Sequence, residues 1–102
     1  MQTMPLARLW REHLQAGCPR ELDGVVIAGT DVRALDAEVT ACVSALLTRT
    51  LRVDGRIERR LSELSAELAR QESRAAPPLA QYCARLNRLV SAALVESRTH
   101  EA

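Results

Sequence analysis

Three cysteines and a histidine are the residues of this sequence that could gather into a metal site. Cys18, Cys42, Cys83 and His13 offer the soft or borderline ligands that zinc prefers. Their spacing matches no zinc pattern, because no two cysteines form a C-x-x-C pair. Cys42 and Cys83 also fall on apolar stripes, where a free cysteine behaves as a small hydrophobic residue. We therefore expect no metal ion, no other cofactor, and reduced thiols in a cytoplasmic protein.

Nucleophilic catalysis would require Cys18 or a serine beside a basic side chain. The chain has only two histidines, His13 on a predicted helix and His100 near its end. No nucleophile elbow, glycine-rich turn or pair of carboxylates accompanies them. We expect no catalytic residues and a protein that is not an enzyme.

An arginine cluster surrounds the start of the third predicted helix. Its members are Arg49, Arg52, Arg56, Arg59 and Arg60. Such a cluster could contact successive phosphates, but Glu58 and Glu63 lie in the same region and no aromatic platform accompanies it. A helix N-terminus disfavours cations, so the helix itself does not stabilise these arginines. Their position there favours an acidic partner. We expect the last four to orient a protein partner, with binding to nucleic acid as the alternative.

Trp10 is the only tryptophan, and it lies between Arg8 and Arg11 on the first predicted helix. This pattern could place the helix on a membrane surface. A helix of about three turns with one tryptophan more often docks on its own bundle. We expect no membrane attachment, and Trp10 is our candidate aromatic anchor for a protein contact.

The spacing of apolar residues predicts a first helix over residues 4–16. Thr3 can cap it, Pro5 is tolerated in its first turn, and Gly17 supplies the stop. Residues 17–30 contain Pro19 and two glycines around a short β-branched run. They predict a loop with, at most, one short extended piece.

Three further helices are expected, over residues 31–48, 54–73 and 78–97. Thr30 or Asp31 can cap the first of these, although Asp36 is an alternative cap that would start the helix near Ala37. Asp54 caps the next, in which leucines step by three and four residues. Pro77 and Pro78 force a boundary and permit a new helix. The short link makes the last two helices an antiparallel hairpin, and residues 98–102 predict a frayed tail.

The composition agrees with a small aliphatic domain. The chain has 102 residues, 47% of them hydrophobic, with Leu, Ala and Val dominant and no Phe. A chain of this length has room for one domain, and we expect it to span residues 1–102. All 14 basic residues are arginine and 13 residues are acidic, so the net charge of +1 gives no global attraction to nucleic acid or membranes. The expected fold is an all-α four-helix bundle.

The stretch VRALDAEVTACVSALL, residues 32–47, is flanked by a Trp-bearing helix and a helical hairpin. With these flanks it resembles a loose group of small uncharacterised actinobacterial proteins, which carry a hydrophobic-Leu-Asp sequence followed by Cys-Val on an apolar helix. The likeness covers most of the chain. It implies a helical fold, and no function is carried over from it.

The apolar faces of the third and fourth predicted helices present more apolar surface than one short hairpin can bury. A remainder left uncovered by the first two helices would form an interface. We therefore expect a non-enzymatic protein-protein interaction or regulatory module that works as a homo-oligomer or as a subunit of a complex. The alternatives are a nucleic-acid-associated regulator that uses the arginine cluster, and a small-molecule-binding helical domain.

Overall fold

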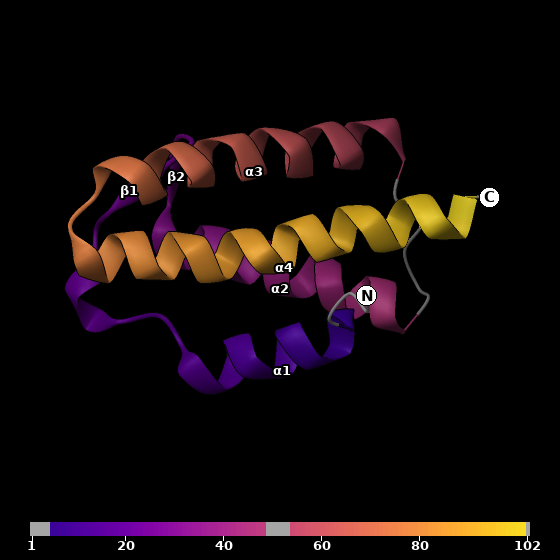
Figure 1. Ribbon diagram of the computed structural model, residues 1–102, viewed down its shortest axis with the longest axis horizontal. Helices are drawn as coiled ribbons and strands as arrows, with labels where there is room; N and C mark the ends of the chain where they lie inside the picture. Colours follow the sequence, from indigo (N-terminus) through magenta and orange to yellow (C-terminus); the bar gives the residue numbers. More distant parts are fainter. Residues whose placement is uncertain (1–4, 49–53, 102) are drawn as a thin grey trace.

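The computed structural model describes residues 5–48 and 54–101 of the chain (Figure 1). Its helices are α1 (Leu6–Ala16), α2 (Val32–Leu47), α3 (Gly55–Arg74) and α4 (Pro77–Glu101). A short 3-10 helix η1 (Arg20–Leu22) and two strands, β1 (Val26–Ile27) and β2 (Thr30–Asp31), lie between α1 and α2. The expected all-α class is confirmed.

Helix α1 begins after Pro5, which occupies the N-cap position without a side-chain hydrogen bond to the helix. The expected cap, Thr3, lies outside the described residues. The helix buries Leu6 and His13 and ends at Gly17. Gly17 has a φ of 68° and donates its N–H to the carbonyl of His13. Glycine adopts positive φ without steric cost, so the chain can turn sharply at this point.

The segment between α1 and α2 is more ordered than the expected loop. Strands β1 and β2 form an antiparallel hairpin in which Val26 pairs with Asp31 and Ile27 with Thr30. The two connecting residues, Ala28 and Gly29, have φ angles of 53° and 77°. Two consecutive positive φ angles are typical of the tight turns whose twist matches that of a hairpin. The hairpin buries Ile27 in the core.

Helix α2 starts at Val32 because Asp31 caps it. The carboxylate of Asp31 accepts hydrogen bonds from the backbone N–H groups of Arg33 and Ala34, at 3.1 and 3.4 Å. The alternative start near Ala37, with Asp36 as cap, is therefore wrong, because Asp36 lies within the helix.

Helices α3 and α4 form an antiparallel hairpin, as expected (Figure 1). Asp54 caps α3 by accepting the N–H of Ile57 at 2.9 Å. Pro77 and Pro78 occupy the first turn of α4, where a missing N–H costs no hydrogen bond. Residues 98–102 were expected to fray, whereas α4 continues to Glu101. Arg98 forms an ion pair with Glu58 at the start of α3, which supports this last part of the helix.

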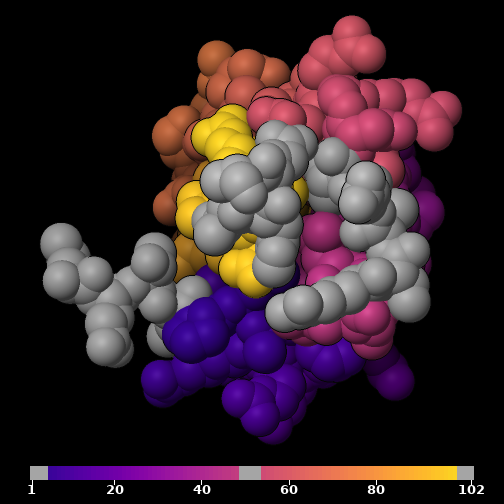
Figure 2. All heavy atoms as spheres, turned by 90° about the vertical axis from the view of Figure 1, so that its right-hand side faces the viewer, coloured from indigo at the N-terminus to yellow at the C-terminus, as the bar shows by residue number. Residues whose placement is uncertain are grey.

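Helix α4 is the central element, and it contacts α1, α2, α3 and η1. Viewed from the end at which α4 finishes, α4 lies between α3 and α1 (Figure 2). The hydrophobic core forms around it from residues of every helix. Its largest fully buried apolar side chains are Ile27, Val32, Leu35, Val39, Val43, Leu64, Leu68, Tyr82, Leu86, Leu89 and Val90. In residues 5–48 and 54–101, no helix combines the length and apolar character that a membrane crossing requires.

Candidate functional site

Four polar side chains from three helices form a hydrogen-bonded chain beside the core. His13 of α1 and Tyr82 of α4 both bond to one carboxylate oxygen of Asp36 in α2. The His13 Nε2 to Asp36 Oδ2 distance is 2.8 Å, and the Tyr82 hydroxyl donates to the same oxygen at 2.6 Å. Arg85 of α4 donates from Nε to His13 Nδ1 at 3.3 Å. Arg85 also donates to the carbonyl of Gly17. We call these four residues the polar network.

These contacts determine how the imidazole of His13 is used. Arg85 can only donate, so Nδ1 of His13 accepts, and Nε2 then carries the hydrogen that points at Asp36. Both ring nitrogens are thus engaged, and the side chain of His13 is only 2% exposed. No ring nitrogen remains to act as a base toward Cys18. These hydrogen bonds join α1, α2 and α4 and give partners to polar groups that burial removes from water. The polar network therefore holds the three helices in position.

The electrostatics of the polar network favour an ionised Asp36. Burial alone raises the pKa of this carboxyl, but the hydrogen bonds from His13 and Tyr82 outweigh burial and hold the pKa below its ordinary value of 3.8. Burial and the adjacent carboxylate raise the pKa of the Tyr82 hydroxyl far above its usual range. Tyr82 therefore remains a donor at any ordinary pH. The guanidinium of Arg85 lies 5.4 Å from the centre of the Tyr82 ring, close enough for a cation–π contact.

The cysteines do not have the features of nucleophiles. Burial is the main cause that raises the pKa of each thiol, to about 11 for Cys83. Cys83 is fully buried, and Cys18 and Cys42 are partly buried against the core. In the part of the chain that the structure describes, no three His, Cys, Asp or Glu side chains gather where they could hold a metal ion.

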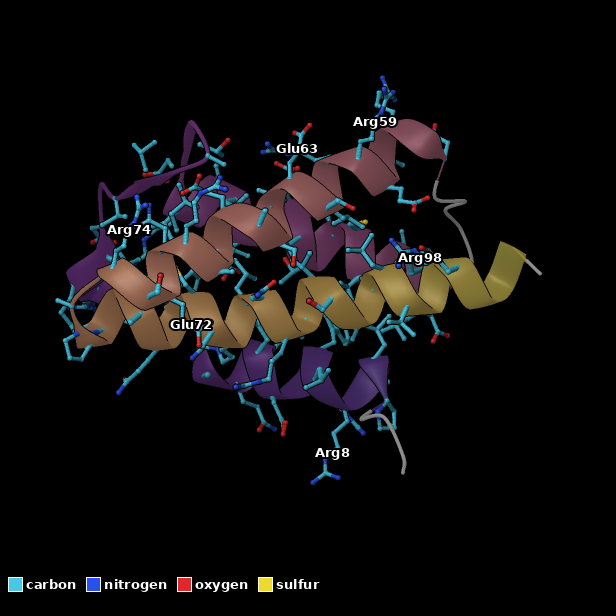
Figure 3. The ribbon with its side chains drawn as sticks, turned by 45° about the horizontal axis from the view of Figure 1, so that its top comes forward. Arg8, Arg59, Glu63, Glu72, Arg74 and Arg98 are labelled. Atoms are coloured by element: carbon cyan, nitrogen blue, oxygen red, sulfur yellow. The ribbon has the colours of Figure 1, made fainter. Side chains whose placement is uncertain are left out.

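The members of the arginine cluster have different surroundings. Arg49 and Arg52 lie outside the described residues. Arg59 is exposed, donates to the carbonyl of Gly55 at 3.3 Å, and points away from the other helices (Figure 3). Arg56 is exposed at the start of α3.

Arg60 instead bridges two helices. Its Nε and Nη2 atoms donate to the two carboxylate oxygens of Glu38 in α2, at 2.9 and 3.1 Å. Nη2 also donates to the Thr30 hydroxyl at 3.3 Å. The hydrogen bond to Glu38 is the main cause that raises the pKa of Arg60. The guanidinium of Arg60 already donates to groups of the same molecule, so it is less available to a partner than the sequence predicts.

Trp10, the predicted anchor, is partly buried and packs against the hydrophobic core. Its indole Nε1 is buried and has no hydrogen-bond partner among the described residues. A buried donor without a partner costs about 1–3 kcal/mol, so the packing of the ring must compensate for it. Little of Trp10 is left to form the centre of an interface.

The described residues line at least two surface hollows between helices. The first, which we call the α1–α4 groove, has a volume of about 570 Å³. It is lined by Pro5, Leu6, Leu9, Glu72, Ala84, Asn87, Arg88, Ser91, Ala92, Val95 and Glu96. Glu72 comes from α3 and marks the border of the groove on that side (Figure 3).

The second hollow, the α2–α3 pocket, has a volume of about 400 Å³. It is lined by Glu38, Val39, Cys42, Arg56, Ile57, Arg60 and Leu61. The pocket exists because α2 and α3 each pack on α4 and make little contact with one another. The Arg60–Glu38 ion pair crosses the space between them.

Comparison of the chain with protein-family models, with curated proteins and with solved structures gives no match. The resemblance to small actinobacterial helical proteins thus stays an expectation. Any function has to be argued from the surfaces of the molecule itself.

Sequence reasoning missed the polar network. It placed His13 on a predicted helix, treated Asp36 as a possible cap, and singled out neither Tyr82 nor Arg85. A signal was present, however, since His13, Asp36 and Tyr82 are each a polar residue at or beside the apolar stripe of a different helix. Such residues require partners when buried, and they can satisfy one another.

Proposed function

We propose that this chain is a non-enzymatic helical interaction module that associates with a second copy of itself through the α1–α4 groove. The observation that carries the proposal is the shape of that face. Leu6, Leu9 and Ala92 belong to the apolar part of its lining, and Val95, a residue that is 52% exposed, lines the same hollow. Apolar hollows beside exposed apolar side chains are typical of interaction surfaces.

A second copy of the chain fits this face because an exposed apolar side chain, that of Val95, and an apolar hollow lie on it together. In a two-fold symmetric contact each surface patch meets the same patch of the partner. Val95 of one copy can then enter the groove of the other, and the reverse contact forms at the same time. A partner of different sequence would need only one of these features.

The charges at the border of the groove support the same occupant. Glu72 of α3 and Arg88 and Glu96 of α4 line one hollow, so charges of both signs occur on it. A border with both signs is self-complementary under a two-fold axis, because Glu72 of one copy can face Arg88 of the other. A strongly acidic partner would meet repulsion from Glu72 and Glu96, and a strongly basic partner would meet repulsion from Arg88.

The nucleic-acid alternative has less support. Arg60 is bound to Glu38 and Thr30, and Arg59 lies on the outer face of α3 with Glu63 one turn away (Figure 3). Phosphate contacts need several unpaired cations along one track. Binding of mixed-sequence DNA or RNA with a steep salt dependence would favour this alternative over self-association.

The mass in solution tests the proposal. We expect a dissociation constant on the order of micromolar, so that at about 100 µM most chains are paired. Light scattering should then give twice the mass of one chain. Val95→Glu should return the mass to that of a single chain, because it buries a charge in the contact.

Val26→Glu is the matched control, because Val26 is an exposed valine, at 60%, on the β1 strand and outside the groove. This variant should still form dimers. Circular dichroism must show that both variants remain helical. A wild-type chain that stays monomeric at these concentrations, or dimers of Val95→Glu as strong as those of Val26→Glu, would contradict the proposal.

A further inference from the structure

The α2–α3 pocket has the features of a ligand site, and it lies apart from the groove proposed for self-association. Its walls are Val39 and Cys42 of α2 and Ile57 and Leu61 of α3. A volume of about 400 Å³ falls within the range of pockets that hold small organic molecules. Apolar walls of this kind favour a ligand with an apolar body.

The charges at the mouth of the pocket select the polar end of such a ligand. Among the residues that the structure describes, the lining contains two arginines, Arg56 and Arg60, and one carboxylate, Glu38. Glu38 is bound by Arg60 through two hydrogen bonds, so these two charges offset one another. The remaining positive charge is that of Arg56, which lies exposed at the rim. One net positive charge above an apolar cavity complements one negative charge on an apolar molecule.

Arg60 is a fixed part of the pocket wall. Because Glu38 and Thr30 already hold its guanidinium, this side chain is ordered before a ligand arrives. Arg56, in contrast, is free to close over the head group of the ligand from the solvent side. The planar guanidinium of Arg56 can offer two parallel donors to a carboxylate or phosphate.

We propose that the α2–α3 pocket binds a small amphiphilic monoanion, with its apolar body between Val39, Cys42, Ile57 and Leu61 and its anionic head on Arg56. Cys42 makes the site measurable, since its thiol is part of the wall. Cys83 is fully buried, so a Cys18→Ser background leaves Cys42 as the thiol that an added reagent reaches first.

The experiment measures the rate at which Cys42 of the Cys18→Ser chain reacts with a small maleimide. Decanoate serves as the probe, below the concentration at which it forms micelles, and decanol is its uncharged counterpart. Burial and Glu38 raise the pKa of the Cys42 thiol, so the reaction is followed above pH 8. We expect decanoate to slow the labelling to a plateau, and decanol to require about tenfold more ligand for the same effect.

Arg56→Gln should weaken the protection by decanoate about tenfold, because it removes the charge and keeps most of the side chain. Arg59→Gln is the matched control, since Arg59 lies on the same turn of α3 and outside the pocket lining. It should change the protection less than about twofold. Both residues are exposed, and circular dichroism checks that each variant folds. The proposal is overturned if decanoate leaves the labelling rate unchanged, if decanol protects equally well, or if the two arginine variants behave alike.

Discussion

Asp36 is the carboxylate of the polar network, and it receives two hydrogen bonds on one oxygen. Its pKa is lower in the folded chain than its ordinary value of 3.8. A carboxyl with a depressed pKa stabilises the fold fully above its unfolded pKa, and the stabilisation is lost as the pH falls through the folded pKa. The relevant window therefore starts at about pH 5 and extends downward.

Asp36→Asn should lower the free energy of unfolding by about 1–3 kcal/mol at pH 7, because the hydrogen bonds from His13 and Tyr82 lose the negative charge of their acceptor. It should also flatten the loss of stability between about pH 5 and pH 3, since the titrating group is gone. Urea unfolding at several pH values measures both effects. Asp23→Asn is the control, because Asp23 forms an exposed pair with Arg33. Equal pH dependence in wild type and Asp36→Asn would contradict the assignment.

Ala28 has a φ of 53° in the turn between β1 and β2. A left-handed conformation costs alanine about 1–2 kcal/mol, whereas asparagine tolerates it better. Ala28→Asn should therefore stabilise the chain by about 0.5–1 kcal/mol, and the β-branched change Ala28→Val should destabilise it. Urea midpoints compare the three proteins. A less stable Ala28→Asn would show that the turn does not limit stability.

The sequence shows that the residues of the polar network need partners, but it does not show that they pair with one another, because each also has a sufficient local explanation. Asp36 can cap a helix, Tyr82 can fill a core, and Arg85 fits a solvated face. Their meeting depends on how α1, α2 and α4 rotate about their axes, which short-range spacing does not determine. Asp31 and Asp54 are different, since a cap acts within three residues of the chain.

The helices themselves were the predictable elements. Apolar residues in steps of three and four define α3 over Gly55–Arg74 close to the expected 54–73. The hairpin of β1 and β2 was missed because two-residue strands have no periodicity to read. The length of α4 was underestimated because its last turns are polar, and their contact with α3 through Arg98 and Glu58 involves distant residues.

The Arg60–Glu38 pair links α3 to α2 across the α2–α3 pocket. A double-mutant cycle of Arg60→Gln and Glu38→Gln should give a coupling energy of about 0.5–1 kcal/mol, since the side chains are 34% and 43% exposed. The Arg70–Glu67 pair within α3 is the comparison, and it should couple more weakly. A coupling energy of zero for Arg60 and Glu38 would mean that water screens the pair fully.

Because α4 contacts every other helix, we expect the whole molecule to unfold as one unit. Leu86→Ala in α4 should cost about 2–5 kcal/mol, since the leucine is fully buried. The fluorescence of Trp10 on α1 and the far-ultraviolet dichroism of all helices should shift together in this variant. Gln81→Ala, on the exposed side of α4, should change stability little. Separate transitions for the two probes would show that α1 unfolds independently.

The central position of α4 also has a consequence during synthesis, because α4 is the last of the four helices to leave the ribosome. Until then the apolar faces of α1, α2 and α3 lack the surface on which they pack. The nascent chain therefore exposes Leu35, Val39, Leu64 and Leu68 to the surrounding solution until α4 has emerged. Collapse to the final fold has to follow the emergence of its central helix.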